Sequence, residues 1–233
     1  MDPNSRLATM MANCRVQSDG FVATSVAAEW RLGAILFARC ANTFVAVRKA
    51  LVEGTTYEFA GMYSLPGGMV RAAASADADQ IPAEELVQVS LGERAHREAG
   101  LSCNRLSRLR ASALGPIMTS YAANGRQRFT LVVAFEADVE VDAPLEAADS
   151  SVDDAFWAPI PPDWERMAPA NRLAVAHIVW KLLDEEGRTA ARCPLERALN
   201  QCSEWAEAVQ VPAAAAPWAS SEELSAWHAA WPV

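Results

Sequence analysis

The sequence lacks the features of a secreted or membrane-inserted protein. It has no N-terminal segment with a charged start, an apolar run and a small-residue cleavage site. No uncharged apolar run reaches the roughly 18 residues needed to cross a bilayer, because Arg31, Arg39 and Arg48 interrupt the most apolar segment. We therefore expect a cytoplasmic protein with no membrane partner.

Paired cysteines are missing as well. The number of cysteines is odd, and none lies in a CxxC pair or at zinc-ligand spacing from other cysteines and histidines. This usage predicts free thiols in a reducing compartment. The residues concerned are Cys14, Cys40, Cys103, Cys193 and Cys202.

Positive charge is scarce. Lysine and arginine number 20 against 29 aspartates and glutamates, which gives a net charge of -9 and a pI near 4.9. This balance opposes binding to a nucleic acid polymer or an anionic membrane through a broad positively charged surface. It is compatible with one small anionic ligand held by a few local cations. The sequence also has no Gly-x-Ser-x-Gly turn, no Walker-type phosphate loop and no dinucleotide-binding glycine pattern.

Apolar residues, in contrast, are plentiful. They make up 52% of the 233 residues while charged residues make up 21%, which is ordinary usage for a folded chain. The length fits one generous domain, which we place at residues 21–188. A flexible N-terminal segment is expected over residues 1–20. A tryptophan-containing helical extension is expected over residues 189–233.

Short β-compatible runs predict a sheet. Residues 32–39 and 44–48 are separated by residues 40–42, where an asparagine suits a tight turn, so a hairpin is expected. Residues 130–135 form the clearest single strand. Further strands are expected over residues 111–117 and 156–160.

A central helix is expected after the hairpin. Pro82 suits a first helical turn, and Glu84 and Glu85 follow it, where the helix dipole favours acidic groups. The helix should end at Gly100, a typical C-terminal stop. The segment before it, residues 72–83, is rich in alanine and aspartate and is expected to form an exposed insertion.

Further helices are expected towards the C-terminus. Helical spacing of apolar residues predicts one helix over residues 169–186, ending at Gly187, and another over residues 195–209. Ser220 and Glu223 match a helix-capping pattern. We expect the tryptophans of the extension to pack on the chain itself, with a homodimer interface as the alternative. They are Trp205, Trp218, Trp227 and Trp231.

Two short motifs frame the central helix. The run Leu65-Pro66-Gly67-Gly68 precedes it, and the run from Glu93 to Leu101 ends it. Together they resemble the signature box of the Nudix family, and the resemblance extends over about residues 27–186. It implies an α+β fold, an α/β/α sandwich in which helices flank a mixed β-sheet, here with a C-terminal helical extension. The box is degenerate, since sixteen residues separate Gly68 from Glu85 where the family has five.

The resemblance also implies a metal site. In the family, the box helix projects carboxylates at i, i+3 and i+4 that hold Mg²⁺ or Mn²⁺ against a diphosphate. The corresponding positions here are Arg94, Arg97 and Glu98. An arginine cannot ligate a cation and repels it, so the usual cluster cannot form unchanged. The expected catalytic and metal-binding residues that remain are Glu98, Glu93 and Glu85.

Three interpretations of the two arginines stay open. In the first, they form i,i+4 ion pairs, Glu93 with Arg97 and Arg94 with Glu98, that only stabilise the helix. In the second, Arg94 and Arg97 bind a phosphate or carboxylate directly, with Gly67 and Gly68 as further ligand contacts. In the third, a remodelled metal site is built from Glu84, Glu85, Glu93 and Glu98 with Asp153 or Asp154.

Three functions are compatible with these patterns. The resemblance implies a Mg²⁺- or Mn²⁺-dependent hydrolase that cleaves a diphosphate linked to a nucleoside or another moiety. The arginines favour a non-hydrolytic binding or regulatory module for a small phosphorylated molecule, with no cofactor. A scaffold recruited to a different biosynthetic reaction is the third, because one fold can host unrelated activities.

Overall fold

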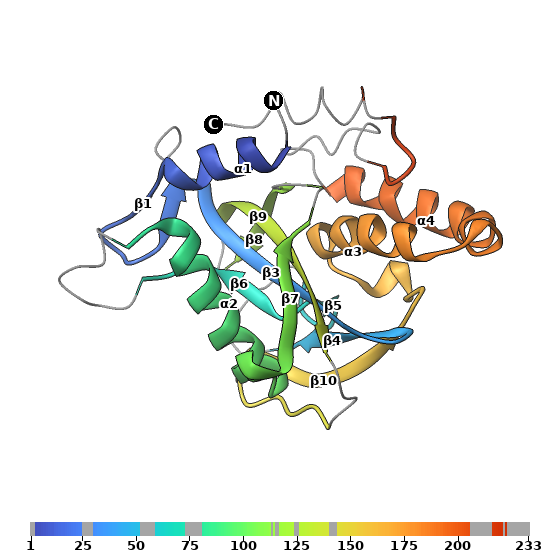
Figure 1. Cartoon of the computed structure of the whole chain (residues 1–233), viewed down its shortest axis with the longest axis horizontal. Helices are drawn as coiled ribbons and strands as arrows, with labels where there is room; N and C mark the ends of the chain where they lie inside the picture. Colours follow the sequence, from blue (N-terminus) through green and yellow to red (C-terminus); the bar gives the residue numbers. More distant parts are fainter. Residues whose placement is uncertain are drawn as a thin grey trace.

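The structure is a computed structural model that describes residues 3–24, 30–51, 59–72, 81–112, 114, 117–123, 126–139, 144–205, 216–220 and 222. The described chain forms ten strands, four α-helices and two 3-10 helices (Figure 1). In chain order they are α1 (Pro3–Ala12), β1 (Cys14–Val16), β2 (Val22–Thr24), β3 (Trp30–Cys40), β4 (Thr43–Lys49), β5 (Tyr63–Ser64), β6 (Gly67–Met69), α2 (Ala83–Ala99), η2 (Cys103–Arg105), β7 (Leu106–Ala111), β8 (Ile117–Ala123), β9 (Arg126–Val139), β10 (Val152–Pro159), η3 (Trp164–Arg166), α3 (Pro169–Leu182) and α4 (Glu185–Trp205).

Strand β3 is the centre of a mixed sheet. It pairs in parallel with β9 and antiparallel with β2, β4 and β6, while β10 lies beyond β4 and β7 and β8 pair with β9. Helix α2 covers one face and helices α3 and α4 cover the other (Figure 1). This is the predicted α+β sandwich of a mixed sheet between helices.

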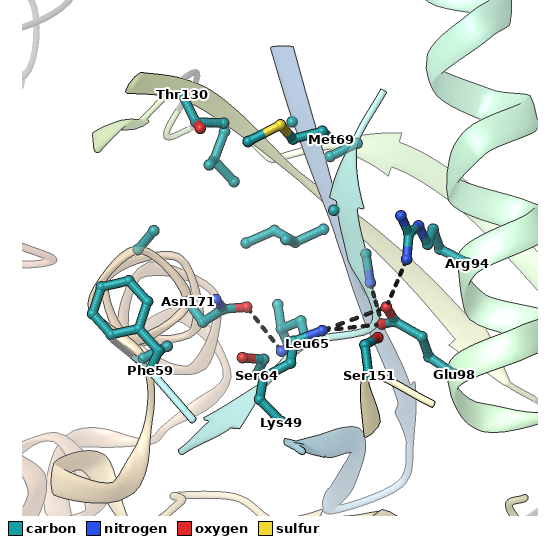
Figure 2. Close-up of a pocket in the computed structure, with 18 of the residues that line it drawn as sticks. Lys49, Phe59, Ser64, Leu65, Met69, Arg94, Glu98, Thr130, Ser151 and Asn171 are labelled. Carbon is teal, nitrogen blue, oxygen red and sulfur yellow. Dashed lines mark hydrogen bonds and ion pairs between the residues drawn. The ribbon is translucent and has the colours of Figure 1, made fainter. Parts of the chain in front are cut away.

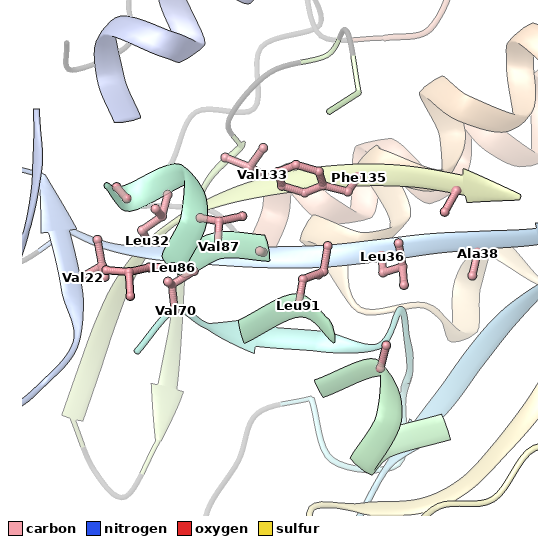
Figure 3. Packing of buried hydrophobic residues seen from close by; sticks show 14 of the residues in the cluster. Val22, Leu32, Leu36, Ala38, Val70, Leu86, Val87, Leu91, Val133 and Phe135 are labelled. Carbon is pink, nitrogen blue, oxygen red and sulfur yellow. The ribbon is translucent and has the colours of Figure 1, made fainter. Parts of the chain in front are cut away.

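The side chains of β3 alternate between the two faces, as the period of a strand requires. Leu32, Leu36 and Ala38 belong to the core beneath α2, whereas Ile35 and Phe37 belong to the core beneath α3 and α4. Figure 3 shows the first core, where Val87 and Leu91 of α2 pack against β3 and β9. A strand buried on both faces explains the nearly continuous apolar run in this part of the sequence.

Several predicted elements are confirmed. The hairpin of β3 and β4 pairs Arg39 with Phe44 and Cys40 with Thr43. Helix α2 begins at Ala83 after Pro82 and is capped by Gly100, whose φ of 70° lies in the left-handed region that glycine adopts freely. The expected strands at residues 130–135 and 156–160 lie within or overlap β9 and β10.

Two predicted boundaries are wrong. The strand expected over residues 111–117 is wrong: β7 ends at Ala111 and β8 begins at Ile117, and Ser112 and Leu114, the described residues between them, belong to neither strand. The sequence between them holds Gly115-Pro116, a pair that favours a turn. Helix α3 ends at Leu182, and Gly187 lies inside α4. Asp184 explains the early start of α4, because its Oδ1 accepts a hydrogen bond from the Gly187 N–H at 2.8 Å, as an N-cap does.

The N-terminal segment also differs from its prediction. Residues 3–16 form α1 and β1 rather than a flexible segment, because Leu7, Met10 and Met11 are buried in the core that also holds α2. The sequence has few charges here, and Leu7, Met10 and Met11 follow the spacing of an apolar helix face. Cys14 is buried beside them, and this burial raises the pKa of its thiol to about 11 despite the nearby Arg15. The four cysteines whose side chains are described, at positions 14, 40, 103 and 193, are free thiols.

The C-terminal extension packs on its own domain in the part that the structure describes. Leu195 and Leu199 of α4 enter the core beneath α3, and the rings of Trp180 and Trp218 meet edge to face at 5.3 Å. The side chain of Trp205, both remaining tryptophans and most of the insertion at residues 72–83 lie outside the described residues. A homodimer interface stays a prediction. Within the described ranges, every helix is too short or too polar to cross a lipid bilayer.

Candidate functional site

A cavity of about 450 Å³ opens between the sheet, the C-terminal half of α2 and the first turn of α3. Its walls include Gly67 and Gly68 of β6. They also include Arg94 and Glu98 of α2 (Figure 2). The structure thus brings both ends of the degenerate box to one cavity. A cavity of this size suits a small molecule.

The segment from Leu65 to Gly68, which joins β5 to β6 and includes the start of β6, forms one wall and is held on both sides. The Leu65 N–H donates to Oδ1 of Asn171, in the first turn of α3, at 2.8 Å. The carbonyl of Pro66 accepts from the Leu36 N–H of β3 at 2.9 Å. Gly67 has a φ of 148° and lies directly against the β3 backbone. These contacts fix the segment where the Gly67 N–H reaches Glu98 of α2.

Glu98 is the buried centre of the site, with no exposed surface. Its Oε2 accepts a hydrogen bond from the Gly67 N–H at 3.0 Å. Lys49 Nζ lies 3.4 Å and 3.5 Å from its two oxygens, and a guanidinium nitrogen of Arg94 lies 3.4 Å from Oε1. Figure 2 shows these three donors converging on the carboxylate. The burial of this charge is therefore offset by two cations and one backbone amide.

The ion pairs continue beyond Glu98 to the rim of the cavity. Arg94 also lies 3.7 Å from Asp149, which forms an ion pair with Arg97. The order of charges is thus Lys49, Glu98, Arg94, Asp149 and Arg97, alternating in sign; we call these five residues the ion chain.

Asp149 is an acid of the ion chain whose pKa is lowered. Burial acts to raise its pKa, but hydrogen bonds from the backbone and hydroxyl of Ser151 and the charge of Arg97 outweigh it, and the pKa falls to about 2. The Ser151 N–H and Oγ donate to Oδ1 at 2.9 Å and 2.7 Å. The loop before β10 is therefore anchored to α2 by a group that is ionised in the folded protein at any ordinary pH.

Replacing Asp149 by asparagine is expected to lower the free energy of unfolding at neutral pH, by an amount that shrinks as the pH falls. The folded pKa of about 2 lies below the ordinary value of 3.8, so the stability that ionised Asp149 contributes is complete above about pH 4 and is lost towards about pH 2. Urea unfolding followed by circular dichroism at several pH values measures this difference. The control is Asp153→Asn, at an exposed acid on β10. A difference for Asp149→Asn that stays constant with pH would contradict the assignment.

The structure brings together only part of the predicted site. Glu98, Arg94, Gly67 and Gly68 all line the cavity. Glu85 and Glu93 are exposed on α2 and are not among the lining residues. Arg97 lies outside the wall, and its partner is Asp149 rather than Glu93. The i,i+4 pair of Arg94 with Glu98 is present.

The remodelled metal site that we considered is not assembled. Glu84, Glu85 and Glu93 are exposed on α2, and Asp153 and Asp154 are exposed on β10. Among the residues whose side chains are described, no three His, Cys, Asp or Glu come together in a way that would hold a metal ion.

Glu98 alone does not fit the Mg²⁺ or Mn²⁺ site that the Nudix resemblance implies. Its oxygens already contact two cations and an amide. A hard divalent cation needs several oxygen ligands and is repelled by adjacent positive charge. A metal at this carboxylate would have to displace both Lys49 and Arg94.

Sequence reasoning missed four residues of the site: Lys49, Asp149, Asn171 and Thr130. Lys49 ends β4 and is 49 positions from Glu98, so no local pattern connects the two. Asp149 lies in a stretch rich in acids and was not distinguishable from its neighbours there. One signal in the sequence could have indicated Lys49: it is a lysine at the end of an apolar strand, where a loop begins, and loops on a rigid scaffold often carry functional side chains.

Comparison with known proteins gives matches in fold alone. No protein-family model and no curated protein matches the sequence. Among solved structures, the NUDIX domain of Shewanella oneidensis NrtR complexed with ADP ribose is 15% identical, with a TM-score of 0.45 over 65% of this chain and 86% of that one. The MutT NUDIX hydrolase from Burkholderia pseudomallei is 17% identical, with a TM-score of 0.42 over 62% and 95%. The MutT protein from Methanosarcina mazei Go1 is 14% identical, with a TM-score of 0.42 over 73% and 93%. These solved structures are only distantly similar to this chain, so its function is inferred from the cavity.

Proposed function

We propose that this protein is a non-hydrolytic binding module that holds one small organic anion, a phosphate or a carboxylate, in the cavity without a resident metal ion. The observation that carries the proposal is that the buried carboxylate of Glu98 forms ion pairs with both Lys49 and Arg94. In the metal site that the box resembles, a divalent cation would lie against this carboxylate. Here two side-chain cations of the protein take its place.

The charges at the cavity favour an anion. Of the ion chain, Lys49, Arg94 and Glu98 line the cavity, and they contribute two positive charges and one negative, which leaves a surplus of one positive charge. Lys49 and Arg94 both line the cavity, and their side chains are 13% and 29% exposed. An arginine presents paired donors that match a phosphate or carboxylate. One incoming negative charge would therefore meet cations already in position.

The expected result is ligand-dependent stabilisation in the presence of EDTA. Inorganic phosphate, AMP and benzoate serve as probes, and binding to the folded state alone raises the melting temperature. Arg94→Gln is expected to weaken binding by about tenfold or more, because it removes a charge-assisted contact. Its control is Arg97→Gln, at an arginine of the same helix that does not line the cavity, where affinity should stay within about twofold. Stabilisation that strictly requires Mg²⁺, or an affinity equal in Arg94→Gln and wild type, would contradict the proposal.

A metal-dependent hydrolase acting on a diphosphate bond is the second candidate. One observation favours it: Glu98 and the glycine loop of the box share the cavity, and the Gly67 N–H is aimed at the carboxylate. A panel of nucleoside diphosphate derivatives assayed with Mg²⁺ or Mn²⁺ tests this candidate. Turnover that disappears in Glu98→Gln would establish it over the binding module, and turnover no higher than in that variant would eliminate it.

A further inference from the structure

The charged groups occupy only one part of the cavity. Figure 2 shows Lys49, Ser151 and Glu98 near one another, with Thr130 and Met69 on the far side of the cavity from them. The rest of the wall is largely apolar, and a charged group placed there would lose its hydration without gaining a partner. The larger apolar side chains of the lining are Phe21, Ile35, Phe59, Leu65, Met69 and Val132.

Thr130 is a polar residue on the far side of the cavity from the charged groups (Figure 2). It lies on β9, is 4% exposed and lines the cavity. Its Oγ1 is a buried atom with no hydrogen-bond partner, and among the described side chains it is the only such atom. Buried hydroxyls are almost always paired in folded proteins, because an unpaired one loses its hydration without compensation. An unpaired hydroxyl beside an open cavity indicates a partner that arrives with the ligand.

The cavity stays open beside this hydroxyl because residue 33 is a glycine. Gly33, on β3, lines the cavity next to Thr130, and a Cβ at this position would lie 2.9 Å from the threonine methyl group. Any larger residue at position 33 would therefore push against Thr130 and narrow this part of the cavity. The absence of a side chain here leaves room for a ligand to extend past the charged part.

We infer that the ligand is an amphiphile: a single anionic group at Lys49 and Arg94, an apolar body along the cavity, and a hydrogen-bonding group that reaches Thr130. This inference rests on the proposed function, since it takes the anion site as given and specifies the rest of the molecule. The surplus of one positive charge matches one anionic group better than a diphosphate. The apolar wall disfavours a ligand with several charges along its length. The unpaired hydroxyl of Thr130 favours a ligand with a polar group at the end opposite its anionic group.

Matched probes test this inference. Octyl phosphate and octanoate are compared with their ω-hydroxy analogues by calorimetric titration of the full chain in EDTA. The hydroxyl-bearing analogue of the preferred headgroup is expected to bind roughly three- to tenfold more tightly, the range that one added hydrogen bond gives. The phosphate and carboxylate series identify which headgroup the anion site prefers. Equal affinity with and without the hydroxyl would overturn the role of Thr130.

Thr130→Val isolates the contribution of the hydroxyl, because it changes the shape of the side chain little. The variant should bind both analogues equally, and its melting temperature without ligand should rise, since an unpaired buried hydroxyl has been removed. Thr24→Val, at a buried threonine of β2 outside the cavity, should leave the affinity ratio unchanged. A ratio that persists in Thr130→Val would overturn the inference.

The probes also separate this inference from the proposal beneath it. If AMP or inorganic phosphate binds in EDTA while the alkyl compounds do not, the amphiphile is wrong and the anion site stands. If neither group of probes binds in EDTA, the anion site itself is wrong.

Discussion

Replacing Arg172 by alanine is expected to lower the free energy of unfolding by about 3 to 5 kcal/mol, the range seen when a large buried side chain with polar partners is lost. Arg172 has no exposed surface. Its guanidinium donates to the carbonyl oxygens of Ala198 at 2.6 Å, Glu165 at 3.0 Å and Met167 at 2.9 Å. Removing it leaves a cavity and takes a donor from each of these carbonyls, which lie on or beside α4 and η3.

Arg197→Ala is the matched control for this variant. Arg197 also joins α4 to η3, but its side chain is 71% exposed and pairs with the carboxylate of Glu165 at 3.7 Å. An exposed pair of this kind is worth at most about 1 kcal/mol. Urea unfolding of both variants, compared at equal m-values, measures the two losses. Similar losses in the two variants would show that Arg172 does not hold α4 to the domain.

Gly67→Ala is expected to lower the free energy of unfolding by about 3 to 5 kcal/mol, combining backbone strain with overpacking. The φ of 148° at Gly67 is a conformation that other residues rarely adopt. A Cβ there would collide with the carbonyl oxygen of Ala34 and lie 2.8 Å from Cα of Ile35. Both atoms belong to the backbone of the central strand β3, so neither can move at low cost.

The adjacent glycine supplies the control. A Cβ at Gly68 would meet only the side chain of Arg94, with Nε at 3.5 Å and Cζ at 3.6 Å, which is ordinary van der Waals contact. Gly68→Ala is therefore expected to change stability by less than about 1 kcal/mol. Thermal unfolding compares the two variants directly. A Gly67→Ala protein as stable as Gly68→Ala would mean that the loop is not fixed against β3 as described.

The local elements could be predicted from the sequence because their signals are local. Pro82, the acids after it and Gly100 lie within or beside the helix that they delimit. The asparagine turn lies between the two strands of its hairpin. The early end of α3 could not be predicted, because the helical spacing of apolar residues continues past Leu182. Asp184 caps the next helix, α4, and this role becomes clear only from its hydrogen bond to the Gly187 N–H.

The chemistry of the site could be predicted only in part. Arg94 and Glu98 are four residues apart on one helix, so their pairing follows from helix geometry. The partners that decide what Glu98 can do come from elsewhere in the fold: Lys49 from the end of β4 and Gly67 from the start of β6. The resemblance to the Nudix box marks positions 94 and 97 as arginines where that family has carboxylates. Both arginines contact Asp149, which is fifty-two positions from Arg97, so the sequence alone does not give their direction.

Binding of Mn²⁺ to the full chain, followed by electron paramagnetic resonance, tests most directly whether Lys49 and Arg94 replace a metal at Glu98. Wild type and Glu98→Gln are titrated in parallel, so that weak Mn²⁺ binding to the acidic surface contributes equally to both titrations. A double variant, Arg94→Glu with Arg97→Glu, places two further carboxylates on the helix face beside Glu98. The account predicts the same Mn²⁺ binding in wild type and Glu98→Gln, and an added site in the double variant. One Mn²⁺ per wild-type chain that Glu98→Gln abolishes would contradict it.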